Sequence, residues 1–138
     1  MPTTTRGILT CYNPSQPDDG ALHLDPEALA HKAVDVLTEH QAEDIALLDI
    51  SKWATFTDFF VIATARSPLQ FSALAEHLEK ELKPLGHDIR LKEGTPASGW
   101  VLLDFGEIIV HLFTAEQRAF YRLEELWGKT TQVIRFAG

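Results

Sequence analysis

Apolar residues recur at helical spacing in three segments of the chain, and each segment follows a residue that can cap a helix. The first begins at Asp25, where Pro26 suits the first helical position because no partner is needed there for a backbone N–H. The second begins at Ser67 and the third at Thr114, and a glycine follows or closes each of them. The pattern predicts three helices, with the apolar stripes Leu29, Ala33, Val36, Leu37 and His40; Phe71, Leu74, Ala75, Leu78, Leu82 and Leu85; and Phe120, Leu123, Leu126 and Trp127.

Short apolar runs between these helices predict strands. Residues 44–50 and 58–65 are almost entirely apolar, which is typical of strands buried on both faces. Residues 87–94 are polar enough for an edge strand, and residues 98–113 are typical of two strands joined by a tight turn. This order of elements predicts an α/β fold, with a single mixed sheet of about five strands and helices packed mainly on one face.

The segment SGWVLLDFGEIIVHLF (98–113) has two faces of different character. With Gly106 and Glu107 as a two-residue turn, Phe105 pairs with Ile108, and side chains alternate between the faces along each strand. One face is wholly apolar and is predicted to join the core: Val101, Leu103, Phe105, Ile108, Val110 and Leu112. The other face carries the cross-strand pairs Trp100–Phe113, Leu102–His111 and Asp104–Ile109.

The mixed face admits two interpretations. A helix of the same chain could cover it, with His111 and Asp104 hydrogen-bonded to each other or to the backbone. It could instead be a docking surface, because protein interfaces favour aromatic anchors accompanied by a few polar groups. We favour the docking surface. Burial of Trp100, Asp104 and His111 beneath a helix of this chain would contradict that interpretation.

Composition narrows the kinds of partner. The chain has 138 residues, enough for one domain, and its 20 acidic and 12 basic side chains give a formal net charge of −8. This charge disfavours direct binding of nucleic acid, whose phosphates attract lysine and arginine, and favours a basic protein. One cysteine (Cys11), no signal-like segment and no membrane-length apolar run indicate a cytoplasmic protein that binds no membrane.

The chain is expected to form a single domain with two extensions. Residues 1–24 are rich in threonine, proline, aspartate and glycine and show no sustained period, so we expect a flexible N-terminal arm. Residues 25–130 are expected to form the α/β domain. Residues 131–138 are expected to form a C-terminal tail.

The residues that could carry catalysis are scattered along the chain. The six histidines stand singly, no two of them four positions apart, and no phosphate-binding glycine loop or nucleophile motif is present. Single acids at strand ends, such as Asp58, do not form the cluster that two metal ions would need. The pattern suggests one acid–base pair, His111 beside Asp104. We therefore expect no enzyme, no metal site and no cofactor.

Two segments carry a resemblance to a known family. LLDISKWATFTDFFVIATARSPLQFSALAEHLEKELK and GWVLLDFGEIIVHLFTAEQRAFYRLEELWG, with their separation, resemble the ribosomal silencing factor family, RsfS or Iojap. The resemblance runs from about Asp25 to Gly128. It implies a fold related to nucleotidyltransferases but without their catalytic acids. It also implies binding of the large ribosomal subunit through ribosomal protein L14, which blocks joining of the small subunit and represses translation when nutrients are scarce.

The resemblance further implies which residues meet the partner. The implied partner is a basic protein, in agreement with the acidic charge of this chain. Two alternatives remain open: a metal-dependent nucleotide-processing enzyme retained from the fold's relatives, and a homodimer that pairs through the same hairpin face. The implied contacts lie on the hairpin and the last helix, at Trp100, Leu102, Asp104, His111, Tyr121 and Trp127.

Overall fold

The computed structural model describes residues 25–128 and 133–136. Its centre is a six-stranded mixed sheet with the strand order β3-β4-β5-β2-β1-β6. The central strands β2 and β5 run parallel, and every other neighbouring pair is antiparallel. The strands are β1 (Glu43–Asp49), β2 (Phe59–Thr64), β3 (Leu91–Thr95), β4 (Trp100–Asp104), β5 (Ile108–Phe113) and β6 (Val133–Phe136).

The helices begin at the caps that the sequence predicts. Asp25, Ser67 and Thr114 each accept a hydrogen bond from a backbone N–H of the first turn, at 2.8, 3.1 and 3.1 Å. Such a cap satisfies a donor that has no partner inside the helix and typically contributes about 1 kcal/mol. The helices are α1 (Pro26–Glu39), α2 (Pro68–Leu82), α3 (Ala115–Tyr121) and α4 (Leu123–Gly128), with the short 3₁₀ segments η1 (Lys83–Leu85) and η2 (Pro96–Ser98).

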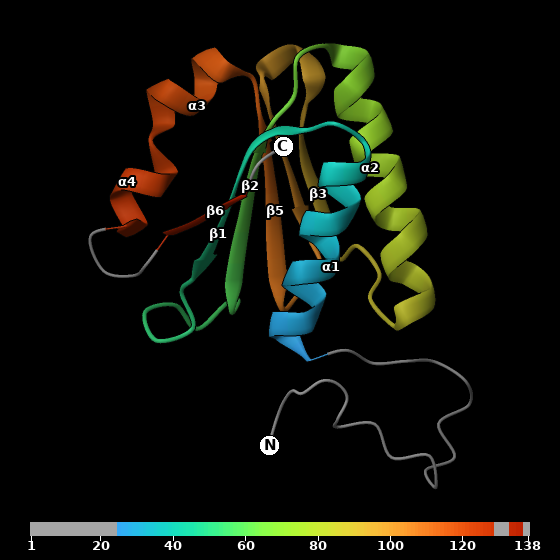
Figure 1. Ribbon diagram of the computed structural model, residues 1–138, viewed down its shortest axis with the longest axis vertical. Coiled ribbons are helices and arrows are strands. Elements are labelled where there is room, and N and C mark those ends of the chain that lie inside the picture. Colours follow the sequence, from blue (N-terminus) through green and yellow to red (C-terminus); the bar gives the residue numbers. More distant parts are fainter. Residues whose placement is uncertain (1–24, 129–132, 137–138) are drawn as a thin grey trace, which may run out of the picture.

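Two layers of unequal size cover the sheet. α1 and α2 pack on one face and form the larger core, together with strand residues such as Leu47 and Val61. α4 contributes Leu123 and Trp127 to a smaller core on the other face, which includes Phe60. Figure 1 shows α3 and α4 apart from α1 and α2, across the strands. The predicted α/β fold, with its helices mainly on one face of a single mixed sheet, is confirmed.

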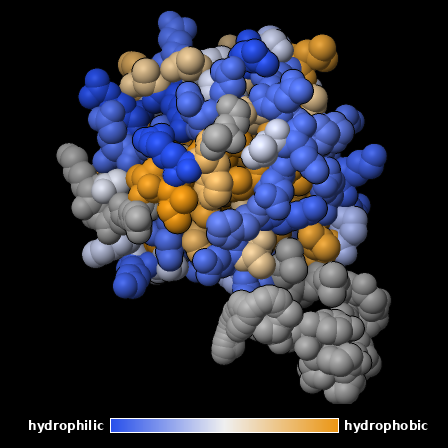
Figure 2. All heavy atoms as spheres, in the orientation of Figure 1, coloured by the Kyte–Doolittle hydropathy of each residue, from blue (hydrophilic) through white to orange (hydrophobic). Residues whose placement is uncertain are grey.

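The face of the domain seen in Figure 2 is mostly polar, with hydrophilic residues surrounding a smaller hydrophobic area near the centre of the view. Some apolar exposure of this kind is normal on a folded domain, because polar side chains are too few to cover it. Among the described residues, no helix combines the length and the apolar content that crossing a membrane requires.

The hairpin of β4 and β5 has the predicted register. Gly106 turns the chain with a φ of +93°, a left-handed value that glycine adopts at little cost. The six side chains of the apolar face are all buried in the larger core, as the alternation predicts. The pairs on the second face are Trp100–Phe113, Leu102–His111 and Asp104–Ile109.

Two elements of the sheet differ from the sequence prediction. The sheet has six strands rather than about five, because residues 133–136, expected in a C-terminal tail, form β6 and pair with β1. The edge strand expected at 87–94 begins later, at Leu91, where pairing with the last residue of β4 begins. Its residues are all exposed, as expected for an edge. The predicted N-terminal arm, residues 1–24, lies outside the described residues.

Gly94 should be required for the strand pairing that carries Trp100. It has a φ of +84°, and a Cβ atom at this position would collide with the backbone carbonyl of Trp100 on the neighbouring strand. We expect Gly94→Ala to lower the free energy of unfolding by more than about 1 kcal/mol, because the backbones of β3 and β4 must move apart. Equilibrium unfolding in urea, followed by circular dichroism, measures this loss.

Gly106→Ala is the matched control for that substitution. Its φ of +93° carries similar backbone strain, but the atoms nearest to an added Cβ are the end of the Arg90 side chain, which can move away. We expect a smaller loss of stability than in Gly94→Ala. Equal losses in the two variants would show that the contact between β3 and β4 adds nothing to the strain of the left-handed backbone.

Candidate protein-binding surface

Trp100 is the centre of an aromatic cluster on the second face of the hairpin. Its ring stacks on Phe113, with centroids 5.0 Å apart and planes at 27°, and packs against Tyr121 of α3 at 4.5 Å. Phe113 is buried, whereas Trp100 is half-buried and Tyr121 is 44% exposed. The cluster thus has a buried floor and an accessible outer layer. We call its accessible part, Trp100 and Tyr121 with their neighbours Leu102 and Phe120, the aromatic surface.

His111 lies against Trp100 and fixes the orientation of its ring. The indole Nε1 of Trp100 donates a hydrogen bond to Nδ1 of His111 at 3.1 Å. His111 is 3% exposed, and its ring meets that of Phe60 edge to face at 4.6 Å. Burial lowers the pKa of His111 to about 3, so its imidazole is neutral near pH 7 and able to accept this bond. His111 is therefore a positioning residue for the indole of Trp100.

Asp104 serves the turn of the hairpin. One of its carboxylate oxygens accepts a hydrogen bond from the backbone N–H of Gly106 at 2.7 Å, the local pattern by which aspartate supports turns. Across the strands it pairs with Ile109 and not with His111. His111 is bonded to Trp100 through Nδ1, and its Nε2 has no hydrogen-bond partner in the part of the chain that the structure describes, so the acid–base pair suggested by the sequence is not formed. Within the described ranges, neither residue belongs to a group of three side chains that could hold a metal ion.

The second face is open along β4 and closed along β5. Alternate residues of β4 are half-buried, whereas every residue of β5 is buried. α1 and α2 lie on the other face of the sheet, and the short helix α4 packs over β1. α3 meets the hairpin through Tyr121, whose ring packs against Trp100. The described helices of this chain thus leave Trp100, Leu102 and Asp104 partly accessible. A docking surface requires this arrangement.

The predicted last helix is divided in two. α3 ends at Tyr121, Arg122 adopts a left-handed φ of +52°, and α4 begins at the next residue. The break turns Phe120 and Leu126 outward, to 73% and 63% exposure, although the sequence placed both in a packed stripe. That prediction was wrong because a single left-handed residue other than glycine leaves no mark in the hydrophobic pattern. Adjacent apolar residues often share the buried face of a helix, as Val36 and Leu37 do in α1, so Phe120 beside Tyr121 gave no sign of exposure.

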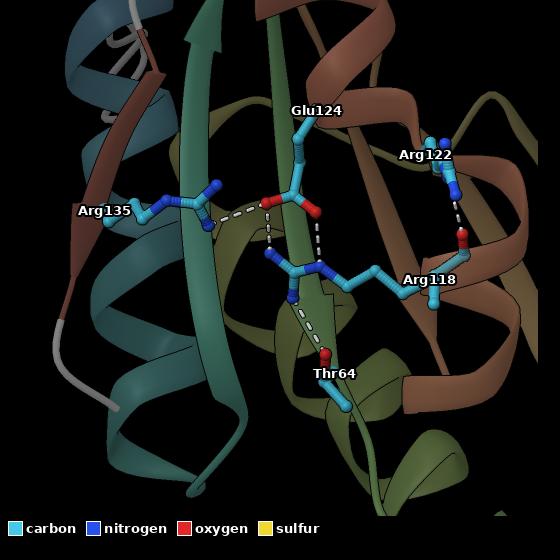
Figure 3. A network of polar contacts seen from close by, with 6 residues as sticks. Thr64, Arg118, Arg122, Glu124 and Arg135 are labelled. Carbon is cyan, nitrogen blue, oxygen red and sulfur yellow. Dashed lines mark hydrogen bonds and ion pairs between the residues drawn. The ribbon is translucent and has the colours of Figure 1, made fainter.

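A largely buried ion pair holds these two short helices against the sheet. Arg118 of α3 and Glu124 of α4 meet through two hydrogen bonds of 2.6 and 2.8 Å, with side chains 10% and 13% exposed. Arg118 also donates to the hydroxyl of Thr64 in β2 at 2.8 Å, and Arg135 of β6 donates to Glu124 at 2.7 Å. Figure 3 shows the carboxylate of Glu124 between the two guanidinium groups. The network joins β2, α3, α4 and β6, and so sets the position of Tyr121.

The network also sets the charge of Glu124. Hydrogen bonds from Arg118 lower the pKa of this carboxyl below its usual value and outweigh its burial, which acts in the opposite direction. Ionised Glu124 therefore stabilises the fold above about pH 4.5, and this contribution is lost as the pH falls further. His111 acts in a higher range. The pKa of His111 is lower in the folded chain than the value of 6.5 in the unfolded chain, so the unfolded chain takes up the proton first. The free energy of unfolding therefore falls as the pH drops below about 6.5.

Trp127 stands beside the aromatic surface rather than on it. It is half-buried, and its ring meets Phe60 edge to face at 5.7 Å in the smaller core. Two aromatic residues that the sequence analysis did not propose as contacts are more exposed, Trp53 at 56% and Phe56 at 58%. Both lie in the connection between β1 and β2, at the opposite end of the strands from Trp100. Their place in an irregular connection between two buried strands was the available sign.

Comparison with known proteins identifies the family. The family model described as "Ribosomal silencing factor during starvation" matches residues 23–137. A ribosomal silencing factor RsfS from Zymomonas mobilis is 41% identical over 115 residues, which cover 83% of this chain and 86% of that protein. The chain belongs to the ribosomal silencing factor family, and the resemblance found in its sequence is confirmed.

More distant relatives extend the match. A crystal structure of a protein from Chromobacterium violaceum superposes with a TM-score of 0.72 at 33% identity, and covers 76% of this chain and 88% of that one. A mouse protein named "Mitochondrial assembly of ribosomal large subunit protein 1" is 31% identical over 137 residues, 91% of this chain and 60% of its own. The names of the Zymomonas mobilis and mouse relatives describe regulation or assembly of the ribosome rather than a reaction, which agrees with the expectation of a protein that is not an enzyme.

Replacing His111 with glutamine should flatten the acid dependence of stability. Glutamine keeps an acceptor for the indole of Trp100 but takes up no proton. The free energy of unfolding of the wild type should fall between about pH 7 and 5, and that of His111→Gln should fall less, because the variant has no imidazole at this buried position that must stay neutral. Urea unfolding at several pH values measures both curves. If the free energies of unfolding of the two proteins fell in parallel between about pH 7 and 5, His111 would not be the cause of the fall. The further loss below about pH 4.5 comes from Glu124 and is expected in both proteins.

Proposed function

We propose that this protein is a ribosomal silencing factor that binds the large ribosomal subunit through ribosomal protein L14. Bound there, it sterically prevents the small subunit from joining and represses translation under nutrient limitation. Family membership supports this proposal. The structural observation that carries it is the aromatic surface, which the described helices of the chain leave open. A protein that acts by occupying a docking site needs an anchoring surface of this kind and no catalytic centre.

The aromatic surface supplies the anchors of the proposed contact. Trp100, Leu102 and Tyr121 are all partly accessible, and the first and last are in ring contact at 4.5 Å. Phe120 extends the surface, with its ring edge to face with Tyr121 at 5.0 Å. Large aromatic side chains near the centre of an interface usually contribute most of the binding energy. We therefore place Trp100 at the centre of the contact.

The other implied residues act by holding these anchors in place. The hydrogen bond from Trp100 to His111 fixes the indole before a partner arrives, so little side-chain freedom is lost on binding. Asp104 supports the turn of the hairpin through Gly106. Trp127 packs α4 against Phe60. We propose Asp104, His111 and Trp127 as members of the site that shape it, with direct contact made mainly by their neighbours.

Charge gives the proposed contact its orientation. The formal net charge of −8 suits a basic ribosomal protein, since complementary charges speed the encounter of two proteins and exclude wrong orientations. α3, which carries Phe120 and Tyr121, and the adjoining α4 have exposed acids, including Glu116 and Glu125. Exposed charges at an interface rim act mainly on the association rate, which should fall as salt is added. The apolar anchors should set the dissociation rate.

Purified protein should co-sediment with isolated large ribosomal subunits and lower the yield of joined ribosomes in sucrose gradients. Trp100→Ala should weaken this binding by about 2 kcal/mol, roughly 30-fold in affinity, because it removes the central anchor. Titration of the protein against a fixed amount of large subunits, followed by pelleting, measures the affinity. Failure of the wild type to pellet with large subunits at low salt would overturn the proposed function.

Trp53→Ala is the matched control. It removes a tryptophan that is more exposed than Trp100, from the connection at the far end of the strands, so the variant should bind large subunits as the wild type does. Equal binding by Trp100→Ala and Trp53→Ala, both folded by circular dichroism, would show that the contact lies elsewhere. Light scattering of the isolated protein tests whether the same surface instead pairs two copies of this chain, in which case Trp100→Ala would be the more monomeric protein.

A further inference from the structure

Two histidines and a glutamate come together where the end of α1 meets α2. His40 caps α1, and His77 and Glu81 stand one helical turn apart on α2. The two imidazole rings are stacked, with centroids 3.5 Å apart and planes at 11°. One ligand atom from each of the three residues lies within 4.8 Å of the others, and all three residues are half-buried. We call these three residues the His–Glu group.

We propose that the His–Glu group binds a divalent transition-metal ion, with zinc as the reference ion. Two imidazole nitrogens and one carboxylate form the ligand set of open zinc sites, in which water takes the fourth position. Imidazole also suits copper and nickel, whereas calcium and magnesium prefer sites built from oxygen ligands. The donor set therefore selects late transition metals over the harder cations.

The spacing of the donor atoms is close to that of a bound ion. Two ligands at about 2.1 Å from a tetrahedral zinc ion are roughly 3.4 Å apart. Nε2 of His40 lies 3.7 Å from Oε2 of Glu81, which is too long for a hydrogen bond but suits two ligands of one ion. The stacked rings of His40 and His77 must rotate so that their nitrogen lone pairs converge on the ion. This adjustment involves side-chain torsions alone.

The backbone that carries these ligands is already held in place. The N–H of His40 donates to the carbonyl of Val36 at 3.1 Å, which completes the last turn of α1. The side-chain amide of Gln70, on α2, donates to the carbonyl of Gln41 at 3.0 Å and so ties the two helices together at this point. Apolar residues of both helices pack in the larger core. An ion would thus meet a backbone already held in place, and its binding would order only the three side chains.

Lys32 opposes the ion. Its ammonium group lies 3.7 Å from Oε1 of Glu81, so it competes for the same carboxylate and repels a cation. The lysine side chain is 37% exposed and flexible, which allows the ammonium group to turn into solvent. The Lys32–Glu81 contact therefore lowers the affinity of the site without closing it.

The His–Glu group is separate from the aromatic surface. It lies on α1 and α2, which cover the opposite face of the sheet from Trp100. An ion held by His40 from one helix and by His77 and Glu81 from the other would link α1 to α2 directly. Because such an ion binds the folded chain, it would stabilise the fold in proportion to its concentration and affinity.

Calorimetric titration of the full chain with zinc chloride, in a buffer free of chelators, tests the proposal. We expect one high-affinity zinc ion per chain, and no comparable binding of magnesium chloride. His77→Gln should lower the zinc affinity at least about tenfold, because it removes one of three protein ligands, and His40→Gln/His77→Gln should abolish binding at this site. Lys32→Gln should raise the affinity roughly two- to fivefold, the range expected for an exposed charge pair.

His31→Gln is the matched control, because His31 is an exposed histidine on α1 outside the His–Glu group. It should bind zinc as the wild type does. Absence of zinc binding by the wild type, or undiminished binding by the double variant, would overturn the proposal. Imidazole resonances of the wild type give a readout that depends on no variant: zinc should shift those of His40 and His77 and leave that of His31 in place, and the reverse pattern would also overturn it.

Discussion

The whole architecture depends on burying both faces of the paired central strands β2 and β5. Their side chains are almost all buried, so water must be excluded from two sides of the same sheet. α1 and α2 are long enough to cover one side completely. The other side receives the short helices α3 and α4 and the aromatic side chains of the hairpin itself. The aromatic surface exists because this second layer is incomplete, and Trp100 acts both as the cover of a buried floor and as the part left open to a partner.

An incomplete layer can anchor a partner only if its residues are held in position. Trp100 is held from below by the hydrogen bond to His111 and from the side by Tyr121. Tyr121 is in turn held by the network of Arg118 and Glu124, which ties its helix to β2 and β6. Burying a carboxylate between two guanidinium groups stabilises a fold only when well-aligned hydrogen bonds offset the cost of desolvation. Here both carboxylate oxygens of Glu124 accept hydrogen bonds. The rigid surface and the membership of the ribosomal silencing factor family support the same role, that of a protein that acts by occupying a docking site.

The sequence predicted what local chemistry decides and missed what distant contacts decide. The predicted helix starts were correct because a capping side chain marks where each helix begins. The predicted faces of the hairpin were correct because the turn at Gly106 and the alternation of side chains fix the strand register. The exposure of each mixed-face residue was not predictable in the same way, since it depends on where α3 and α4 come to rest. The left-handed Arg122 that separates them and the pairing of β6 with β1 are tertiary effects with weak sequence signals. The His–Glu group was missed because its ligands come from different helices.

The parallel pairing of β2 with β5 also has a consequence for chain entropy. β1 with β2, and β4 with β5, are joined by short connections, whereas Phe59 meets Ile108 only after α2, β3 and β4 have intervened. Closing this longer loop removes more freedom from the unfolded chain than closing either hairpin does. We call the line of pairing between β2 and β5 the seam. Contacts along the seam must offset this loss of chain entropy, including the contact between Phe60 and His111 on the less covered side. Side chains beneath the aromatic surface therefore help to join the two halves of the sheet, and a partner seated on that surface would reinforce the seam.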